Sequence, residues 1–261
     1  MFKDTDRAKC DQLFDRYYKG RKFSRTLYRD LVRAHVAAGH RVLDAGCGRY
    51  LEFSRELPEG AEVFGIDLEP SLDTRNQNSP FGIRADLEHI PFASNQFDLV
   101  ISRSVIEHLH DPAAVFKEFH RILKPGGKVI FSTPNKYDYV SIIASLTPYS
   151  WHRRLASETL QVSEDDVFPT LYRANTRSAL RKHLGSAGFE ERMLDAINHY
   201  PVYLMFSPTL FRLGIVYERI TSLNLLKWLR GTLLCVFEKT YRPTSSVDQK
   251  QEKAAGLVMN P

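Results

Sequence analysis

The chain has 261 residues, of which 43% are hydrophobic and 26% charged, and its formal net charge is +5. This composition is typical of a soluble globular protein with one large domain, or one domain with an appended subdomain. The three cysteines are scattered and form no CxxC pair, so we expect neither a zinc site nor a disulfide framework. A reducing, cytoplasmic compartment is the simpler interpretation. We expect no secretory signal or membrane span, because the N-terminus is charged and the apolar runs are short.

The predicted elements begin with two helices, at about residues 6–18 and 24–38, which we assign to an N-terminal helical lid over residues 1–40. Residues 41–200 then alternate strands with helices, which is typical of parallel βαβ units. Strands are expected at residues 41–44, 62–67, 82–85, 97–102, 128–133 and 190–196. Helices between them are expected at residues 51–57, 71–75, 104–108, 112–123 and 176–187, with Asn175 or Thr176 as N-cap of the last. The pattern therefore predicts an α/β fold with a mostly parallel sheet.

Two segments do not fit this alternation. Residues 135–173 form an insertion rich in aromatic and basic residues, placed where it can form a lid or a substrate wall. Residues 201–242 carry apolar residues every three or four positions, which predicts an amphipathic extension of two helices. These helices are expected to pack on the core or form a homodimer face, with peripheral contact to the inner face of a membrane through residues 201–240 as the alternative. Residues 243–261 are polar and are expected to form a flexible tail.

The most informative stretch is a short apolar strand that breaks into a glycine turn, Val42-Leu43-Asp44-Ala45-Gly46-Cys47-Gly48. Two glycines in three residues let the backbone bend sharply and let a ligand approach the main chain. Such a turn at the carboxyl end of a parallel strand is where open α/β sheets bind their ligands. The acid before the turn would oppose a phosphate, so it indicates a ligand with positive charge or with amine and hydroxyl donors.

Two further acids follow at the ends of later strands. Asp67 follows the second strand, where a carboxylate can accept both hydroxyls of a ribose. Asp86 follows the third strand, where it can reach the exocyclic amine of an adenine ring. A single acid after a strand is a weak signal. In this order on successive strands, however, the acids indicate one shared ligand.

The motifs VLDAGCG, FGIDLEPS, ADLEHIPFASNQFDLVIS, SVIEHLHDP and RILKPGG resemble those of the class I S-adenosylmethionine-dependent methyltransferases. The similarity is to the small-molecule branch typified by ubiquinone and menaquinone biosynthesis methyltransferases, and it covers residues 41–135. It implies a Rossmann-like, doubly wound, mostly parallel seven-stranded sheet and S-adenosyl-L-methionine as the cofactor. It also implies methyl transfer to oxygen or carbon of a small-molecule, lipid-like or glycan acceptor.

The resemblance also implies the residues that contact the cofactor. In chain order these are Asp44, Gly46, Cys47, Gly48, Asp67, Leu68, Asp86, Leu87, Ser102 and Arg103. The glycine loop would hold the methionine part, Asp67 the ribose hydroxyls and Asp86 the adenine, while the backbone at Ser102 would pass beneath the methionine amine. The third small residue of the family loop is Tyr50 here, a ring that could cover the cofactor or narrow the entry.

His108 is the catalytic base that the sequence favours, because it ends the short helix after the fourth strand and faces the expected cofactor pocket. The alternative is that His108 caps that helix or orients Glu107. Weaker candidates are Tyr149, His152 and His199. The ubiquinone O-methyltransferases carry an acid three residues before the Glu-His pair that helps to hold a metal. Ser104 stands at that position here, so we expect no metal.

Three other functions compete with this interpretation. A nicotinamide-dependent oxidoreductase would share the acid after the second strand, but GxGxxG would need a glycine at Leu51, and Asp44 would repel a pyrophosphate. A nucleic-acid amino-methyltransferase would carry Asn or Asp, two prolines and an aromatic residue where Ser102-Arg103-Ser104-Val105 stands, so no nucleic-acid partner is expected. A catalytically inactive cofactor-binding module stays open, although the intact series of acids argues against it.

Overall fold

The structure is a computed structural model that describes residues 4–48, 57–69, 82–147 and 168–240. Several sequence predictions lie outside the described residues. They are the helix at 71–75, the tail at 243–261, Tyr50, Tyr149, His152 and, apart from Leu57, the helix at 51–57. Among the described residues, no helix combines the length and the apolarity that crossing a bilayer requires.

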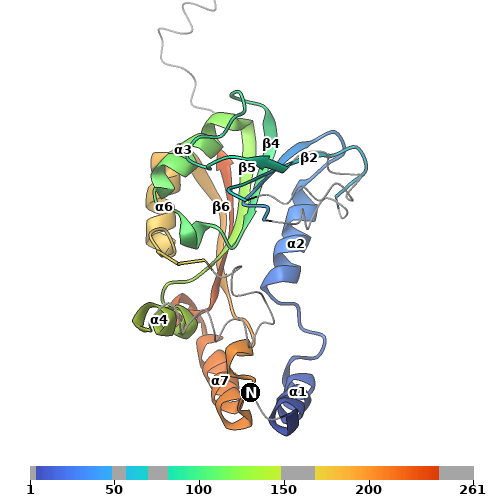
Figure 1. The fold of residues 1–261 in the computed structure, drawn as a ribbon, viewed down its shortest axis with the longest axis vertical. Coiled ribbons are helices and arrows are strands. Elements are labelled where there is room, and N and C mark those ends of the chain that lie inside the picture. The colour runs from blue at the N-terminus through green and yellow to red at the C-terminus, as the bar shows by residue number, and fades with distance from the viewer. Residues whose placement is uncertain (1–3, 49–56, 70–81, 148–167, 241–261) are drawn as a thin grey trace, which may run out of the picture.

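Within the described residues, one sheet of seven strands has the order β3-β2-β1-β4-β5-β7-β6 (Figure 1). The strands are β1 (Arg41–Ala45), β2 (Glu62–Asp67), β3 (Gly82–Arg84), β4 (Phe97–Arg103), β5 (Leu123–Pro134), β6 (Phe189–Ile197) and β7 (Thr232–Lys239). Strands β1 to β5 pair in parallel, whereas β7 runs antiparallel to both β5 and β6. This confirms the predicted mostly parallel, doubly wound α/β fold.

Helices cover both faces of the sheet (Figure 1). In chain order they are α1 (Asp4–Tyr18), α2 (Ser24–His35), α3 (Pro112–Ile122), α4 (Tyr139–Leu146), α6 (Arg177–Ser186) and α7 (Pro208–Thr221), with 3-10 turns η1 (Ile106–His108), η3 (Val202–Leu204) and η4 (Asn224–Leu229). Local signals set their starts. The Asp111 carboxylate caps α3 next to Pro112, and the Thr176 hydroxyl accepts the Ala179 N–H at the start of α6.

The central strands are buried on both faces, and β4 shows how. Val100 packs into a cluster with α3 and α6, whereas Leu99 and Ile101 on either side of it pack into a second cluster with α2. Side chains alternate across a strand, so a strand covered on both faces needs apolar residues at nearly every position. The near-continuous apolar run of β4 therefore fixes its place in the middle of the sheet.

The prediction of a second amphipathic helix near residues 226–236 is wrong, because residues 232–239 form strand β7. Leu233 to Phe237 are all buried, and Cys235 lies opposite Phe131 of β5 and Leu194 of β6. A short apolar run that is buried on both faces has no periodicity that separates a strand from a helix. The extension at 201–242 is thus helical only in η3, α7 and the 3-10 turn η4, and its last part completes the sheet.

The first helix of that extension, α7, is confirmed, but its buried face differs from the predicted one. The predicted repeat of apolar residues every three or four positions runs through Phe206, Leu210, Leu213, Tyr217 and Ile220. Leu213 and Ile220 are nevertheless exposed, and α7 buries Phe211 and Ile215 instead. The buried face of α7 packs against α1 through a cluster that contains Phe211 and Tyr18. Both faces carry apolar residues, which is why the periodicity alone selected the wrong one.

The segment after α1 is also tied to α7 by an ion pair. The Arg21 guanidinium donates to both carboxylate oxygens of Glu218, at 2.9 and 3.3 Å, and Glu218 is 4% exposed. Because α7 follows β6 and α4 follows β5, these helices lie beyond the carboxyl edge of the sheet (Figure 1). The role of residues 1–40 as a lid stays a prediction.

Candidate functional site

The strand order reverses between β1 and β4, which places a crevice at their carboxyl ends. The chain leaves β1 toward β2 and β3 on one side and returns to β4 on the other side of β1. Open α/β sheets bind ligands at such a switch point. The residue pairs Ala45–Ile66 and Asp67–Arg84 set the ends of β1, β2 and β3 side by side. The predicted cofactor residues therefore gather at one edge.

The glycine loop after β1 adopts a backbone that favours glycine. Gly46 and Gly48 have φ values of +78° and +59°, in the left-handed region. A Cβ on Gly46 would lie 2.2 Å from Cγ2 of Val105, so the loop and the turn after β4 pack without room for a side chain. A Cβ on Gly48 would meet nothing within 4 Å, so that side of the loop is open.

The Asp67 carboxylate joins the glycine loop to the end of β2. Its Oδ2 accepts the Gly48 N–H at 2.8 Å, and its Oδ1 accepts the Glu69 N–H at 3.0 Å. A carboxylate has about four acceptor positions, so both oxygens can still accept a hydroxyl. Leu68, which follows Asp67, is 64% exposed and offers an apolar surface beside the carboxylate.

The other predicted acids take different positions at this edge. Asp44 is buried at the end of β1, below the loop. Asp86 is exposed after β3, and its Oδ1 accepts the Glu88 N–H at 2.9 Å, while Leu87 between them is buried. Asp44 can thus accept hydrogen bonds from beneath a ligand in the crevice. Asp86 can accept them at the rim of the crevice.

Two predicted residues have side chains that are already engaged. The Ser102 hydroxyl is fully buried and donates to the Ala45 carbonyl at 2.8 Å, which ties β4 to β1. Arg103, which ends β4, lies near the buried acid Glu107 and partly opposes the rise in pKa that burial causes there. Burial, with the Asp44 and Asp67 carboxylates nearby, raises the pKa of the Cys47 thiol to about 12. Cys47 therefore stays a thiol at neutral pH and is no nucleophile.

His108 lies in η1, and one of its ring nitrogens is hydrogen-bonded to the backbone. Its Nδ1 lies 2.7 Å from the Pro169 carbonyl oxygen, which can only accept, so Nδ1 carries the hydrogen. In the neutral ring, Nε2 then keeps a free lone pair, and it lies 4.0 Å from Oε1 of Glu107. This tautomer suits a proton acceptor, and the contact with Glu107 also fits the alternative orienting role.

Glu107 is a buried acid that the sequence reasoning treated only as a partner of His108. It is 3% exposed, and its Oε2 accepts the Thr133 hydroxyl at 2.9 Å. The Thr133 oxygen in turn accepts from Nδ2 of Asn175 at 2.6 Å. Burial raises the pKa of Glu107 above its ordinary value of 4.5, and nearby His108 opposes that rise. The Glu-His dipeptide marked the position, but its burial depends on β5 and on the start of α6.

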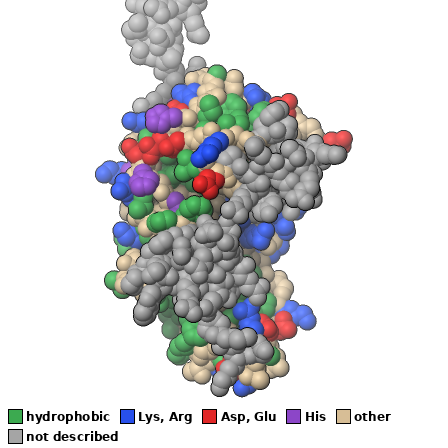
Figure 2. Space-filling model, in the orientation of Figure 1, with side chains coloured by type: hydrophobic (Ala, Val, Ile, Leu, Met, Phe, Trp, Pro, Cys, Tyr) green, Lys and Arg blue, Asp and Glu red, His purple; other side chains and the backbone are tan. Residues whose placement is uncertain are grey.

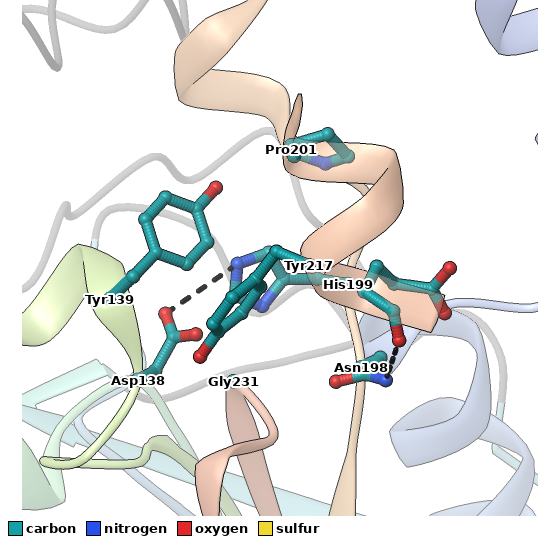
Figure 3. A pocket seen from close by; sticks show the side chains of 9 residues that line it. Asp138, Tyr139, Asn198, His199, Pro201, Tyr217 and Gly231 are labelled. Carbon is teal, nitrogen blue, oxygen red and sulfur yellow. Dashed lines mark hydrogen bonds and ion pairs between the residues drawn. The ribbon is translucent and has the colours of Figure 1, made fainter. Parts of the chain in front are cut away.

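A second polar cluster lines a small pocket of about 10 Å³ between α4, α7 and the start of β7 (Figure 3). Nε2 of His199 lies 3.7 Å from Oδ2 of Asp138, which is 2% exposed and whose pKa is raised by burial. The imidazole lies on Gly231, where a Cβ would come within 2.0 Å of the ring. The Tyr139 hydroxyl is buried without a hydrogen-bond partner in the described part of the chain. Of the weaker sequence candidates, His199 thus lies in a pocket.

Tyr203 of η3 lies near both buried acids. Burial and the nearby Tyr172, Asp138 and Glu107 raise the pKa of Tyr203 to about 12. Glu107 follows β4 and Asp138 follows β5, so this polar region continues from the crevice along the carboxyl edge. The sequence did not indicate Tyr203, because only the fold brings η3 to these acids.

Comparison with known proteins assigns the family. Residues 43–131 match the family described as a methyltransferase domain. The ubiquinone biosynthesis O-methyltransferase of Ruegeria pomeroyi is 32% identical over 176 residues, which cover 63% of this chain and 71% of that protein. The chain belongs to the class I S-adenosylmethionine-dependent methyltransferases. This confirms the resemblance seen in the motifs, and it identifies S-adenosylmethionine as the cofactor of the family.

Two further comparisons define how far the similarity extends. The Pseudomonas aeruginosa protein of the same name is 36% identical over 107 residues, or 38% of this chain, and the chain spans only 46% of its length. The crystal structure of an S-adenosylmethionine-dependent methyltransferase from Mesorhizobium loti has a TM-score of 0.54 at 19% identity, covering 80% of this chain and 96% of that one. That structural likeness supports the fold.

The packing of the glycine loop can be tested with Gly46→Ala. We expect a loss of about 1–2 kcal/mol for the left-handed backbone and about 1–3 kcal/mol more for overpacking against Val105. Gly126→Ala is a matched control, because Gly126 has a φ of +74° but no atom within 4 Å of an added Cβ. Urea unfolding of both variants measures the difference, and equal losses would contradict the close contact.

The buried state of Glu107 makes a prediction about pH. Since its folded pKa is raised, the neutral acid stabilises the fold at low pH, and this stabilisation is lost as the pH rises through the folded pKa. Glu107→Gln stays neutral and can still accept from Thr133. The stability of Glu107→Gln relative to the unaltered protein should therefore increase between about pH 4 and about pH 8.

Thermal unfolding across that range measures the effect. Glu190→Gln, at a side chain that is 58% exposed on β6, is the control and should follow the unaltered protein. A Glu107→Gln curve parallel to that of the unaltered protein would show that Glu107 ionises as freely in the folded state as in the unfolded state.

Proposed function

We propose that this chain transfers a methyl group from S-adenosylmethionine to a hydroxyl oxygen of a small, lipid-like acceptor. The observation that carries the proposal is the Asp67 carboxylate, which joins the glycine loop to β2 and keeps capacity for two more hydrogen bonds. The relatives named as ubiquinone biosynthesis O-methyltransferases support oxygen as the atom that is methylated. Carbon methylation and a glycan acceptor stay predictions that no observation favours.

The residues present fit the cofactor by the chemistry of their donors and acceptors. The ribose hydroxyls and the ammonium group of S-adenosylmethionine donate hydrogen bonds, and the acids at this edge accept them. Asp67 would hold the ribose, Asp86 and Leu87 the adenine, and the loop from Asp44 to Gly48 the methionine part. When bound, the cofactor supplies a methyl group made electrophilic by the sulfonium. The protein then has to orient the acceptor and remove its proton.

His108 would take the proton from the acceptor hydroxyl at Nε2. The Pro169 carbonyl holds Nδ1–H, so the free nitrogen is fixed in one orientation. Protonation would make an imidazolium 4.0 Å from Oε1 of Glu107, which in its ionised form would favour the charged ring. His108 would thus be the base, and Glu107 a positioning residue.

The acceptor would lie along the carboxyl edge, between η1 and the cavity lined by Asp138 and His199. Tyr139 and Tyr217, whose ring centroids are 5.0 Å apart, line that cavity and offer an aromatic wall. The unpartnered Tyr139 hydroxyl could bond to a polar group of the acceptor. These features support an acceptor with a hydroxyl group that reaches this small pocket.

Binding of S-adenosylhomocysteine tests the cofactor site. Asp67→Asn removes the charge that would accept the ribose hydroxyls, so the affinity should fall by about 1–3 kcal/mol. Asp195→Asn, at a side chain that is 70% exposed on β6, should bind like the unaltered protein. Isothermal titration calorimetry measures both. An unchanged affinity of Asp67→Asn would place the cofactor elsewhere.

Turnover separates an active enzyme from an inactive binding module. We expect S-adenosylhomocysteine release and a new methoxy group on alkylated catechols, with His108→Gln slower by a factor of about 10² or more but able to bind the cofactor. Mass spectrometry and NMR of the product identify the methylated atom. Cofactor binding without turnover on catechols or simple phenols would favour the inactive module, and a new carbon–methyl bond would contradict oxygen methylation.

A further inference from the structure

Three helical segments beyond the carboxyl edge expose large apolar side chains. Leu225 of η4 is 87% exposed and Leu146 of α4 is 79% exposed. We define the apolar face by six side chains that are each at least 48% exposed: Ile143, Leu146, Leu213, Ile220, Leu225 and Trp228. Isolated exposed leucines are common, but several on adjoining helices form an interaction surface.

Aromatic contacts join these segments into one surface. The rings of Tyr137, just before α4, and Trp228 of η4 have centroids 5.8 Å apart. The rings of Tyr139 and Tyr217 pack against each other and join α4 to α7. Figure 1 shows α4 and α7 beside each other below the sheet, and hydrophobic atoms are visible at the lower left of Figure 2. The three segments that carry the apolar face are therefore in contact with one another.

The exposed charges on these three segments have one sign. Lys136, Arg212, Arg219 and Lys227 are exposed on the three segments or next to them. The acids of the same segments point inward: Asp138 is 2% exposed beside His199, and Glu218 is 4% exposed and bound by Arg21. From residue 135 to 147 and from 208 to 229, the outward charge is thus entirely positive, in a chain with a net charge of +5.

We propose that the apolar face docks on the surface of an anionic lipid bilayer. Leucine and isoleucine would enter the boundary between headgroups and acyl chains, Tyr137 and Trp228 would lie at headgroup level, and the basic side chains would meet lipid phosphates. A second copy of this chain is a poorer occupant. A symmetric dimer places the same patch against itself, which would bring the two sets of cations together.

Docking requires neither the cofactor nor an acceptor, so this inference does not depend on the proposed methyl transfer. Docking and methyl transfer are linked by position, because Tyr139 and Tyr217 line the pocket and also form the contact between α4 and α7. A lipid-like acceptor in the bilayer would then meet the protein at the elements that line its cavity.

Vesicle sedimentation of the full chain tests the proposal. The probes are phosphatidylcholine vesicles and phosphatidylcholine vesicles that contain phosphatidylglycerol. We expect binding to the anionic vesicles that weakens as salt is added. Leu213→Glu combined with Leu225→Glu changes two exposed side chains and should lower the partition coefficient at least about tenfold. Ser186→Glu at the exposed end of α6 is the control for added charge, and circular dichroism checks that each variant folds.

Each outcome decides the question. Loss of binding in the double variant but not in Ser186→Glu supports the apolar face as the docking surface. Binding that is equal in all variants would assign docking to another part of the chain. A folded protein that stays in the supernatant with anionic vesicles overturns the proposal. If light scattering then shows a dimer that the double variant dissociates, the face belongs to a second copy.

Discussion

The hydrogen bond from the Gly48 N–H to the Asp67 carboxylate is the contact on which the candidate site depends. It holds the turn after β1 against the end of β2 at 2.8 Å, while the Ala85 N–H bonds to the Asp67 carbonyl and brings in the end of β3. Gly46 packs against Val105 beyond β4 on the other side. Asp67 thus joins the ends of β1, β2 and β3, and its carboxylate still has free acceptor positions. Such preorganisation lowers the entropy lost when a ligand binds.

The same edge continues from the proposed cofactor crevice to the region that we propose for the acceptor. Glu107 and Asp138 are buried acids after β4 and β5, and Tyr203 lies near both. Buried acids are costly unless they are hydrogen-bonded or paired, and here Thr133 and His199 partner them. Buried titratable groups next to a ligand crevice are common where protons are transferred. This arrangement supports a division of the edge into a cofactor half and an acceptor half.

Sequence reasoning predicted the parts of the fold that local signals determine. The strands up to β6, the N-cap of α6 and the acids at strand ends all follow from short-range patterns. Strand β7 was missed because Leu233 to Phe237 are buried between β5 and β6, which removes the alternation that marks a strand. The Asp138–His199 cluster joins residues 61 positions apart, so no local pattern could reveal it. The burial of Glu107 likewise depends on distant partners.

The central claim is that Asp67 binds the ribose of S-adenosylmethionine at the switch point between β1 and β4. A crystal structure with S-adenosylhomocysteine tests it most directly. The account predicts both ribose hydroxyls within hydrogen-bond distance of the Asp67 carboxylate, with the Gly48 N–H contact retained. A nucleoside bound outside this crevice, or an Asp67 side chain turned away from the ribose, would contradict it.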